Sequence, residues 1–209
     1  MEEAGIATDL FHNHYEEHWH HQNDELPANH QRYPLVQYKL HHRRAELVGI
    51  GVGAIALQLW LQTSGGSINI AGKAHPIKIR AFQPLEWQPK LLAQAVVYRM
   101  NKWLPLNPAN YRTWQATPRL IHKAELLDKA LWGHLFYFTE CLEVNLPRDR
   151  LELFVSNIDR QTYKRCYGVQ KMAFDITFTT NLNLPNEIGL GQGVSLGFGK
   201  LQRLPQLRS

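Results

Sequence analysis

The sequence predicts an α+β fold of alternating strands and helices, and three observations predict it. Apolar residues recur at every second position between residues 172 and 184, which is the period of a half-buried strand. They recur at every third or fourth position between residues 118 and 142, which is the period of a helix. Shorter strand-like runs accompany these two segments, at residues 33–40, 46–50, 95–100 and 151–155.

The first part of the chain is predicted to contain two hairpins around one helix. Residues 33–40 and 46–50 form the first hairpin, because the His41-His42-Arg43-Arg44 sequence between them is short and polar. Residues 53–62 carry Ile55 and Leu59 on one side, as a helix does, and a Ser-Gly-Gly-Ser sequence then ends that helix. A second hairpin is predicted from Ile68 to Ile79.

The second part of the chain is predicted to contain a long helix between strands. The helix is expected over residues 118–142, with Thr117 as its cap and Pro118 in its first turn. In the strand at residues 172–184, even positions are expected to face the core. The odd positions are expected to face outward, and they are Asp175, Thr177, Thr179 and Asn181.

Residues 83–90 contain two prolines and no hydrophobic period, as a connection between units does. We therefore expect an N-terminal half at residues 1–86 and a C-terminal half at residues 87–209. Strands flank a helix in each half, so the prediction is a tandem of ferredoxin-like βαββαβ units. Only about a dozen residues precede His12. Either the start is misassigned or the first unit lacks its opening strand.

Composition restricts the function classes. The formal net charge of +5 and the pI near 9.2 favour a polyanionic partner such as nucleic acid or acidic lipid. Two cysteines without a CxxC spacing argue against a disulfide framework and a zinc knuckle. No apolar run reaches the roughly 20 residues of a membrane span, and the N-terminus lacks the features of a secretory signal. A cytoplasmic location is expected.

Five glycines fall within eleven positions near the C-terminus, arranged as two Gly-apolar-Gly triplets around five residues. They are Gly189, Gly191, Gly193, Gly197 and Gly199. Glycine permits positive φ and close backbone approach, so successive amides can converge on a phosphate. A flexible turn with glycines at bulges is the alternative. The dinucleotide fingerprint is excluded, because the chain ends before the acidic residue that this motif requires.

This glycine pattern, following a long alternating strand, resembles the signature loop of the RAMP superfamily of CRISPR proteins. Further segments, in order, resemble the branch that processes pre-crRNA, the sixth Cas family: Leu10-Phe11-His12-Asn13-His14, Tyr33 to Lys39, Val48 to Gly51, Trp103 to Asn107 with Asn110-Tyr111, and the terminal loop. The resemblance covers residues 10–203. It implies paired ferredoxin-like (RAMP) folds, metal-independent RNA cleavage without a cofactor, and association with other Cas proteins of an effector complex or a reverse transcriptase-integrase.

The resemblance also implies catalytic residues, among which His14 and His12 take part in proton transfer. RNA is cut without metal when its 2′-hydroxyl attacks the adjacent phosphorus, leaving a 2′,3′-cyclic phosphate and a 5′-hydroxyl. Histidine suits the proton transfers, and lysine suits the phosphoryl charge. Lys39 is the candidate lysine, because strand alternation places it with Gln37 on a face opposite Val36, Tyr38 and Leu40, pointing out of the core. A hydrogen-bonded structural histidine and a solvated lysine are the alternatives.

Basic residues around the long strand and the terminal loop could follow an RNA backbone. They are Lys164, Arg165, Lys171 and Lys200, with solvated edge charges as the alternative reading. In the loop, Gln192 and Leu196 occupy positions where relatives commonly carry basic residues. Eight of the eleven histidines lie between His12 and His42, but no second group of ligands with metal spacing accompanies them, so no metal site is predicted.

Three functions remain open from the sequence. The first is a pre-crRNA endoribonuclease acting on CRISPR repeat RNA. The second is a non-catalytic RAMP subunit that binds crRNA through the terminal loop. The third is a histidine-rich, metal-dependent hydrolase, which the absence of a ligand set disfavours.

Overall fold

The computed structural model describes residues 33–41 and 44–205. They divide into two compact units. The first contains Leu47–Gln88 and the residues up to Val36, and the second contains Gln37–Glu46 and the residues from Pro89 onward. The strands β1 (Val36–His41) and β2 (Arg44–Gly49) form one hairpin. Each of these two strands has residues in both units.

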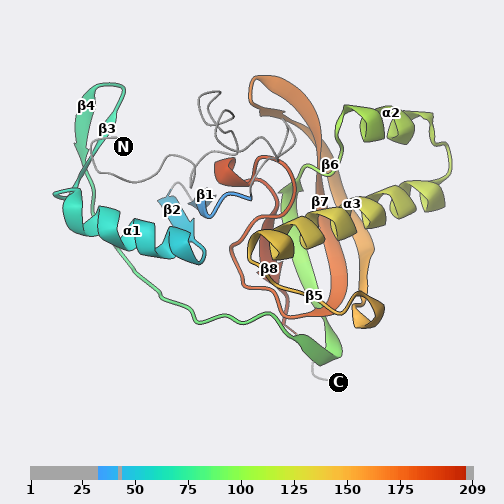
Figure 1. Ribbon diagram of the computed structural model, residues 1–209. Coiled ribbons are helices and arrows are strands. Elements are labelled where there is room, and N and C mark those ends of the chain that lie inside the picture. Colours follow the sequence, from blue (N-terminus) through green and yellow to red (C-terminus); the bar gives the residue numbers. More distant parts are fainter. Residues whose placement is uncertain (1–32, 42–43, 206–209) are drawn as a thin grey trace, which may run out of the picture. The chain divides into compact units, whose positions relative to one another are not determined.

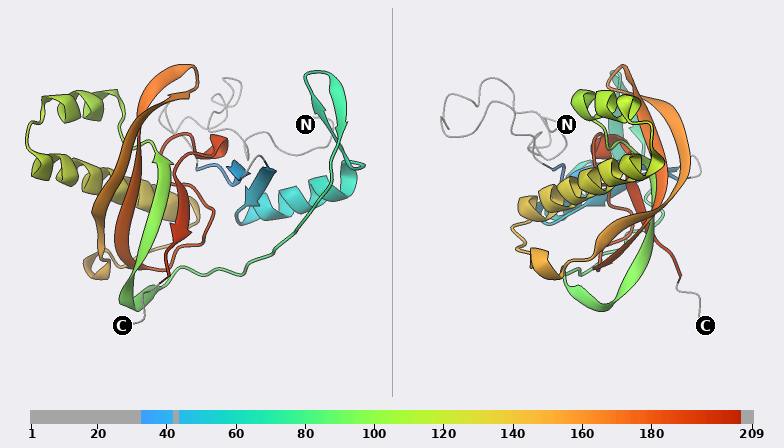
Figure 2. Two further views of the ribbon diagram at one scale, coloured as in Figure 1. Left: turned by 180° about the vertical axis from the view of Figure 1, so that it is seen from behind. Right: turned by 90° about the vertical axis from the view of Figure 1, so that its right-hand side faces the viewer.

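The second unit is a four-stranded antiparallel sheet with helices on one face (Figures 1 and 2). Its strands are β5 (Leu91–Trp103), β6 (Leu153–Cys166), β7 (Val169–Leu182) and β8 (Lys200–Arg203), in the order β6-β7-β5-β8. Between β5 and β6 the chain forms α2 (Pro108–Ala116), α3 (Leu120–Cys141) and the short η4 (Arg148–Arg150). This is the strand order of a ferredoxin-like unit, as predicted.

One element of that unit is replaced. A complete ferredoxin-like unit has a second helix before its last strand. Here residues 183–199 take that place, and they contain only the 3₁₀ turn η5 (Val194–Leu196). The glycine-rich loop therefore connects the central part of the sheet to its edge strand β8.

The alternation predicted for β7 is confirmed. Its even positions from Met172 to Leu182 are buried, and Asp175, Thr177 and Thr179 are half-exposed. Asn181 is an exception, because it was expected outside but is 8% exposed. Its side chain is satisfied inside the protein: Oδ1 accepts from the Glu152 amide at 2.9 Å, and Nδ2 donates to the Arg150 carbonyl at 2.8 Å.

The long helix exists, but its predicted start was wrong. Thr117 caps the end of α2, and α3 begins after Arg119 without a side-chain cap. The reason is the additional helix α2, whose start is fixed when Asn107 Oδ1 accepts the Asn110 amide at 2.8 Å ahead of Pro108. Residues 117–119 form the connection between two helices and so cannot belong to α3.

The two helices pack on the sheet through apolar residues. Four α3 side chains, those of Leu127, Leu131, Leu135 and Phe138, are fully buried. On α2, the Trp114 ring meets the Phe174 ring of β7 edge-on, with centroids 5.0 Å apart. No helix in the described part of the chain is long and apolar enough to cross a membrane.

The first unit contains α1 (Val52–Thr63) and a hairpin of β3 (Ser67–Ile70) and β4 (Lys73–Pro76), as predicted. Its small core joins Leu57 of α1 to Val36, with Ala56 and Trp60 packed against them. Gly53 lies so close to Leu35 that an added Cβ would approach the Leu35 carbonyl oxygen to 2.3 Å. Among the described residues, β1-β2 and β3-β4 remain separate two-stranded sheets.

Truncating the buried face of α3 is expected to destabilise the second unit. Leu131→Ala should lower the free energy of unfolding by about 2–5 kcal/mol, because it removes a fully buried side chain and leaves a cavity. The matched variant Leu120→Ala changes a side chain that is 71% exposed and should cost less than about 0.5 kcal/mol. Urea unfolding of both variants measures the difference, and equal effects would contradict the burial of this face.

Candidate nucleic-acid interface

The glycine-rich loop is closed at its base by backbone pairing. Gly189 and Lys200 form an antiparallel bridge, with the Leu190 amide on the Gly199 carbonyl at 3.0 Å and the Leu201 amide on the Ile188 carbonyl at 2.8 Å. The Gly199 amide also donates to the Lys102 carbonyl of β5 at 3.3 Å. The loop is thus a folded extension of the sheet.

Contacts inside the protein account for the glycines of this loop. At Gly199, where φ is +65°, an added Cβ would lie 1.9 Å from the Leu190 carbonyl oxygen. At Gly191, where φ is +94°, it would lie 2.8 Å from the indole nitrogen of Trp103. A Cβ at Gly189, Gly193 or Gly197 would also come within 3.1 Å of a protein atom. Close packing therefore disfavours any side chain at four of these positions, and at Gly197, where the contact is milder, the φ of +88° disfavours one.

Several amides of the loop nevertheless remain available. Within the described residues, the amides of Gly191, Gly193, Val194 and Ser195 make no backbone hydrogen bond. Three of these four residues are buried. Buried amides in proteins are almost always paired with protein, water or ligand. These amides of the loop are therefore donors whose hydrogen bonds a ligand or water can accept.

Lys39 lies against this loop, and the prediction for its direction was wrong. The exposed fraction is 3% for Lys39 and 0% for Gln37, whereas Tyr38 and Leu40 are exposed. Lys39 Nζ donates to the Val194 carbonyl at 3.4 Å, and Gln37 Oε1 accepts the Gly189 amide at 2.9 Å. The hydrogen-bond partners of both side chains are backbone atoms of the loop, which is distant only in sequence. The face of β1 that carries Gln37 and Lys39 is therefore buried.

Burial changes the ionisation of Lys39. Its pKa is lowered from 10.5 to about 7, mainly because the charged ammonium is removed from water and also because Lys200 is near, while Glu187 opposes the shift. The protein therefore places an amine that changes charge near neutral pH against the Val194 end of the loop.

The predicted RNA-binding lysines of the loop region are engaged with protein groups. Lys200 pairs with Glu187 and lies 3.8 Å from a Glu46 carboxylate oxygen of β2. Lys171 of β7 donates to Gln192 Oε1 at 2.6 Å. Gln192 is neutral, but the Lys171 ammonium bound to it places a positive charge at this position of the loop.

Lys164 and Arg165 lie at the far end of the β6-β7 hairpin. Tyr167 and Gly168 both have positive φ and form its two-residue turn. Lys164 stands directly opposite Lys171 in the register, a repulsive like-charge pair. The turn also reaches the loop, since the Tyr167 and Ser195 hydroxyls are 3.3 Å apart. Lys164, Lys171 and the loop are therefore neighbours in one unit.

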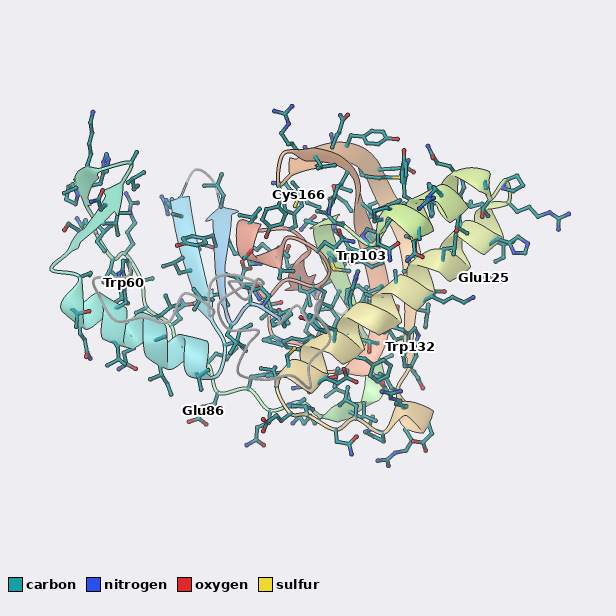
Figure 3. The ribbon with its side chains drawn as sticks, turned by 45° about the horizontal axis from the view of Figure 1, so that its top comes forward. Trp60, Glu86, Trp103, Glu125, Trp132 and Cys166 are labelled. Atoms are coloured by element: carbon teal, nitrogen blue, oxygen red, sulfur yellow. The ribbon has the colours of Figure 1, made fainter. Side chains whose placement is uncertain are left out.

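Beneath the loop lies a histidine that sequence reasoning missed (Figure 3 labels its partner Trp103). Trp103 Nε1 donates to His134 Nδ1 of α3 at 3.1 Å. Burial lowers the pKa of His134 to about 4, so the ring is neutral at neutral pH and carries its proton on Nε2. Gly191 rests on this pair, and no sequence spacing relates the three residues.

The structure brings together only part of the predicted site. Lys39, Lys164, Lys171, Lys200 and the glycines lie in the second unit around the loop. His12 and His14 lie outside the described residues. Gln37 and Glu187 were missed, although the alternation of Gln37 with Lys39 was a signal for a shared face. Among the residues that the structure describes, no group of three or more His, Cys, Asp or Glu could hold a metal.

Comparisons with known proteins agree with this fold and this loop. A family model described as the Cas6b N-terminal domain matches residues 4–86, and one described as the Cas6b C-terminal domain matches residues 90–204. The chain is 24% identical over 142 residues to the uncharacterized protein MJ0978 of Methanocaldococcus jannaschii, covering 66% of this chain and 93% of that protein.

Two solved structures share the fold. A crystal structure of a CRISPR RNA processing endoribonuclease Cas6b has a TM-score of 0.67 at 20% identity and covers 83% of both chains. Csf5, a type IV Cas6 crRNA endonuclease, has a TM-score of 0.57 at 14% identity and covers 98% of this chain and 92% of that one. The family matches, together with the shared fold, place the chain among the RAMP-type CRISPR proteins. The family matches extend through both halves, and the chain belongs to the Cas6b family.

Adding a methyl group at Gly199 should disrupt the loop. Gly199→Ala meets the Leu190 carbonyl and is strained at positive φ, so we expect a loss of at least about 2 kcal/mol of stability. Gly168→Ala is the matched control, because Gly168 also has positive φ but its Cβ would meet nothing within 4 Å. Thermal unfolding compares the stability of the two variants, and equal losses of stability would show that close packing of the loop does not contribute to the stability of the protein.

The buried amine predicts a pH dependence of stability. Between pH 7 and 10.5 the unfolded chain binds more protons at Lys39 than the folded chain, so the folded state gains stability as the pH rises through this window. Lys39→Met cannot make that gain. Its stability relative to wild type should therefore fall by about 2 kcal/mol between pH 6.5 and pH 9, as measured by urea unfolding.

The exposed Lys90→Met is the control for loss of a lysine at these two pH values. A constant difference between Lys39→Met and wild type at both pH values would contradict the burial of the Lys39 ammonium.

Proposed function

We propose that this member of the Cas6b family is an endoribonuclease that cuts CRISPR repeat RNA to mature crRNA. Cleavage proceeds without a metal ion or cofactor, by attack of the 2′-hydroxyl on the adjacent phosphorus. The products carry a 2′,3′-cyclic phosphate and a 5′-hydroxyl. The observation that carries the proposal is the Cas6b family match over residues 4–86 and 90–204, because it includes both the His12-His14 segment and the glycine-rich loop.

His14 and His12 perform the proton transfers in this proposal. One imidazole accepts the proton of the 2′-hydroxyl or donates a proton to the 5′-oxygen that leaves. Histidine suits both steps because its ordinary pKa lies near neutrality. The electron pair of the 2′-oxygen forms the new P–O bond while the P–O bond to the 5′-oxygen breaks, so the reaction needs no oxidant, reductant or water.

Lys39 and the loop amides stabilise the charge on the phosphoryl oxygens. Support comes from the position of Lys39 Nζ, 3.4 Å from the Val194 carbonyl, beside the unused amides of residues 193–195. An ammonium buried in a low-dielectric site interacts more strongly with a developing anion than a solvated one does. A phosphate next to Lys39 would also favour its protonated form, opposing the lowered pKa.

The RNA backbone follows the glycine-rich loop and the neighbouring β6-β7 hairpin. Lys164, Arg165 and Lys171 lie on that hairpin, and the like-charge pair of Lys164 and Lys171 would be relieved by a phosphate between them. Lys200 contacts the RNA backbone once its ion pairs with Glu187 and Glu46 are broken. We further propose action in the cytoplasm, delivery of the crRNA to other Cas proteins, and a functional division of the chain at residues 86 and 87.

The second candidate function is a crRNA-binding subunit without activity. The observation that favours it is the engagement of the loop cations, since Lys200 is paired with two glutamates and Lys39 with a carbonyl. In that case the loop binds RNA, and the histidines contribute nothing to a reaction.

The distinguishing experiment uses CRISPR repeat RNA as the substrate. The wild type should cut this RNA in the presence of EDTA and leave a cyclic phosphate that alkaline phosphatase alone does not remove. A single 2′-deoxy substitution at the cleavage position should abolish cutting while RNA is still bound. Cutting of the deoxy substrate would reject the mechanism, and tight binding with no cutting would favour the second candidate.

Removing the catalytic imidazole should slow single-turnover cleavage by roughly 100- to 10,000-fold, because a general acid or base is lost. We expect this for His14→Ala and, to a similar or smaller degree, for His12→Ala, with RNA affinity little changed. His122→Ala is the matched control, since His122 is an exposed residue of α3 whose ring lies 3.5 Å from a Glu125 carboxylate oxygen. Loss of activity in the control as well would point to a general effect on the protein.

A further inference from the structure

The first unit carries a basic hairpin that the proposed site does not use. We propose that β3, β4 and the following residues 77–82, here called the arm, bind the sugar-phosphate backbone of RNA. This inference rests on the proposed function for the identity of the polyanion. It adds a binding surface in residues 67–82, to which the sequence reasoning assigned no RNA contact.

Charge segregation is the first observation. Residues 47–85 contain no Asp or Glu, although the chain has 18 acidic residues. Within the same span, Lys73, Lys78 and Arg80 supply three positive charges, all on exposed side chains of the arm. A cluster of cations attracts a polyanion, and residues 47–85 themselves offer no carboxylate that would compete for these three.

The exposure of the hairpin is the second observation. The strands pair Ile68 with His75 and Ile70 with Lys73, and the Ile77 amide extends the pairing to the Gly66 carbonyl at 2.8 Å. Every residue of β4, and all of β3 except Ile68, is exposed. Figure 1 shows the hairpin projecting beyond the end of α1. An isolated two-stranded hairpin is only marginally stable in water, so a partner that covers it would stabilise it.

Exposed apolar side chains accompany the cations. The exposed fractions are 53% for Ile70, 55% for Ile79 and 60% for Phe82. An exposed aromatic ring next to basic residues is the combination with which proteins hold single-stranded nucleic acid, since bases stack on the ring while cations track the phosphates. In the sequence Ile77-Lys78-Ile79-Arg80 the cations alternate with apolar residues, so an extended chain presents Lys78 and Arg80 on one side.

An anionic membrane is the competing partner, and the helix of this unit argues against it. α1 does expose Val52, Ile55 and Leu59. An interfacial helix normally carries Lys or Arg on its polar face, whereas α1 has no charged residue at all. The cations lie instead on the arm, with Lys73 on β4 and both Lys78 and Arg80 in the extended residues after it, where their arrangement matches an extended phosphate chain better than a lipid surface.

The test replaces the three cations in the full-length protein, as Lys73→Gln, Lys78→Gln and Arg80→Gln together. The probe is a fluorescein-labelled oligouridylate of 30 nucleotides, titrated at several salt concentrations. Wild type should show a salt-dependent Kd, and the triple variant should bind more weakly with a log-log slope reduced by about 2, since each single-strand phosphate contact contributes about 0.7.

The matched control changes the same charge elsewhere, as Lys90→Gln, Arg119→Gln and Lys129→Gln, all exposed in the second unit. Its slope should stay close to that of wild type. An unchanged slope in the arm variant, or equal losses in both variants, overturns the inference. So does binding of wild type to phosphatidylglycerol vesicles that depends on the arm while binding to RNA does not.

The arm and the proposed cleavage can fail separately. If wild type never cuts repeat RNA but the arm variant loses salt-dependent affinity, the arm inference stands and the proposed activity fails. If wild type cuts and the arm variant binds and cuts normally at all salt concentrations, the activity stands and the arm inference fails.

Discussion

The packing of the glycine-rich loop against β1 is the contact on which the candidate site depends. Two buried polar side chains make it, with Gln37 on the Gly189 amide and Lys39 on the Val194 carbonyl. Each would be costly to bury alone, and each is satisfied by a backbone group of the loop. The loop in turn lies close enough to β1 that a Cβ at Gly197 would meet the Tyr38 carbonyl oxygen at 3.1 Å. The strand and the loop hold one another in place.

This contact explains why the glycine pattern serves two purposes. The five glycines let the loop fold back on itself and lie on Trp103, His134 and Cys166, so they fix its shape. The same tight path turns amides of residues 191 and 193–195 away from backbone partners. A loop that is rigid and retains free donors is better prepared for an anion than a flexible one, because less ordering is required on binding. Structural and functional interpretations of the glycines are therefore compatible.

Sequence reasoning succeeded where periodicity was long. The alternation of β7 and the apolar period of α3 each span at least ten residues, and both elements were found where expected. It failed where a boundary depended on a neighbouring element or a direction depended on a partner distant in sequence. The Thr117-Pro118 pair resembles a helix start, but α2 uses Thr117 as its own end. Lys39 was placed on the outer face because it alternates with the apolar residues of its strand, and no local feature reveals the carbonyl that accepts its hydrogen bond.

The sequence by itself determined the α+β class, the ferredoxin-like order of the second unit, the family, and the residue types of the loop, because these follow from local periodicity and from short motifs in a fixed order along the chain. Tertiary structure decided which cations face the loop, that Glu46 and Glu187 hold Lys200, and that His134 lies neutral beneath Gly191. Most of these contacts join residues more than 30 positions apart; the exceptions are Glu187 with Lys200 and Lys171 with Gln192. Burial and charge pairing are properties of the folded arrangement, so a linear pattern of residues does not contain them.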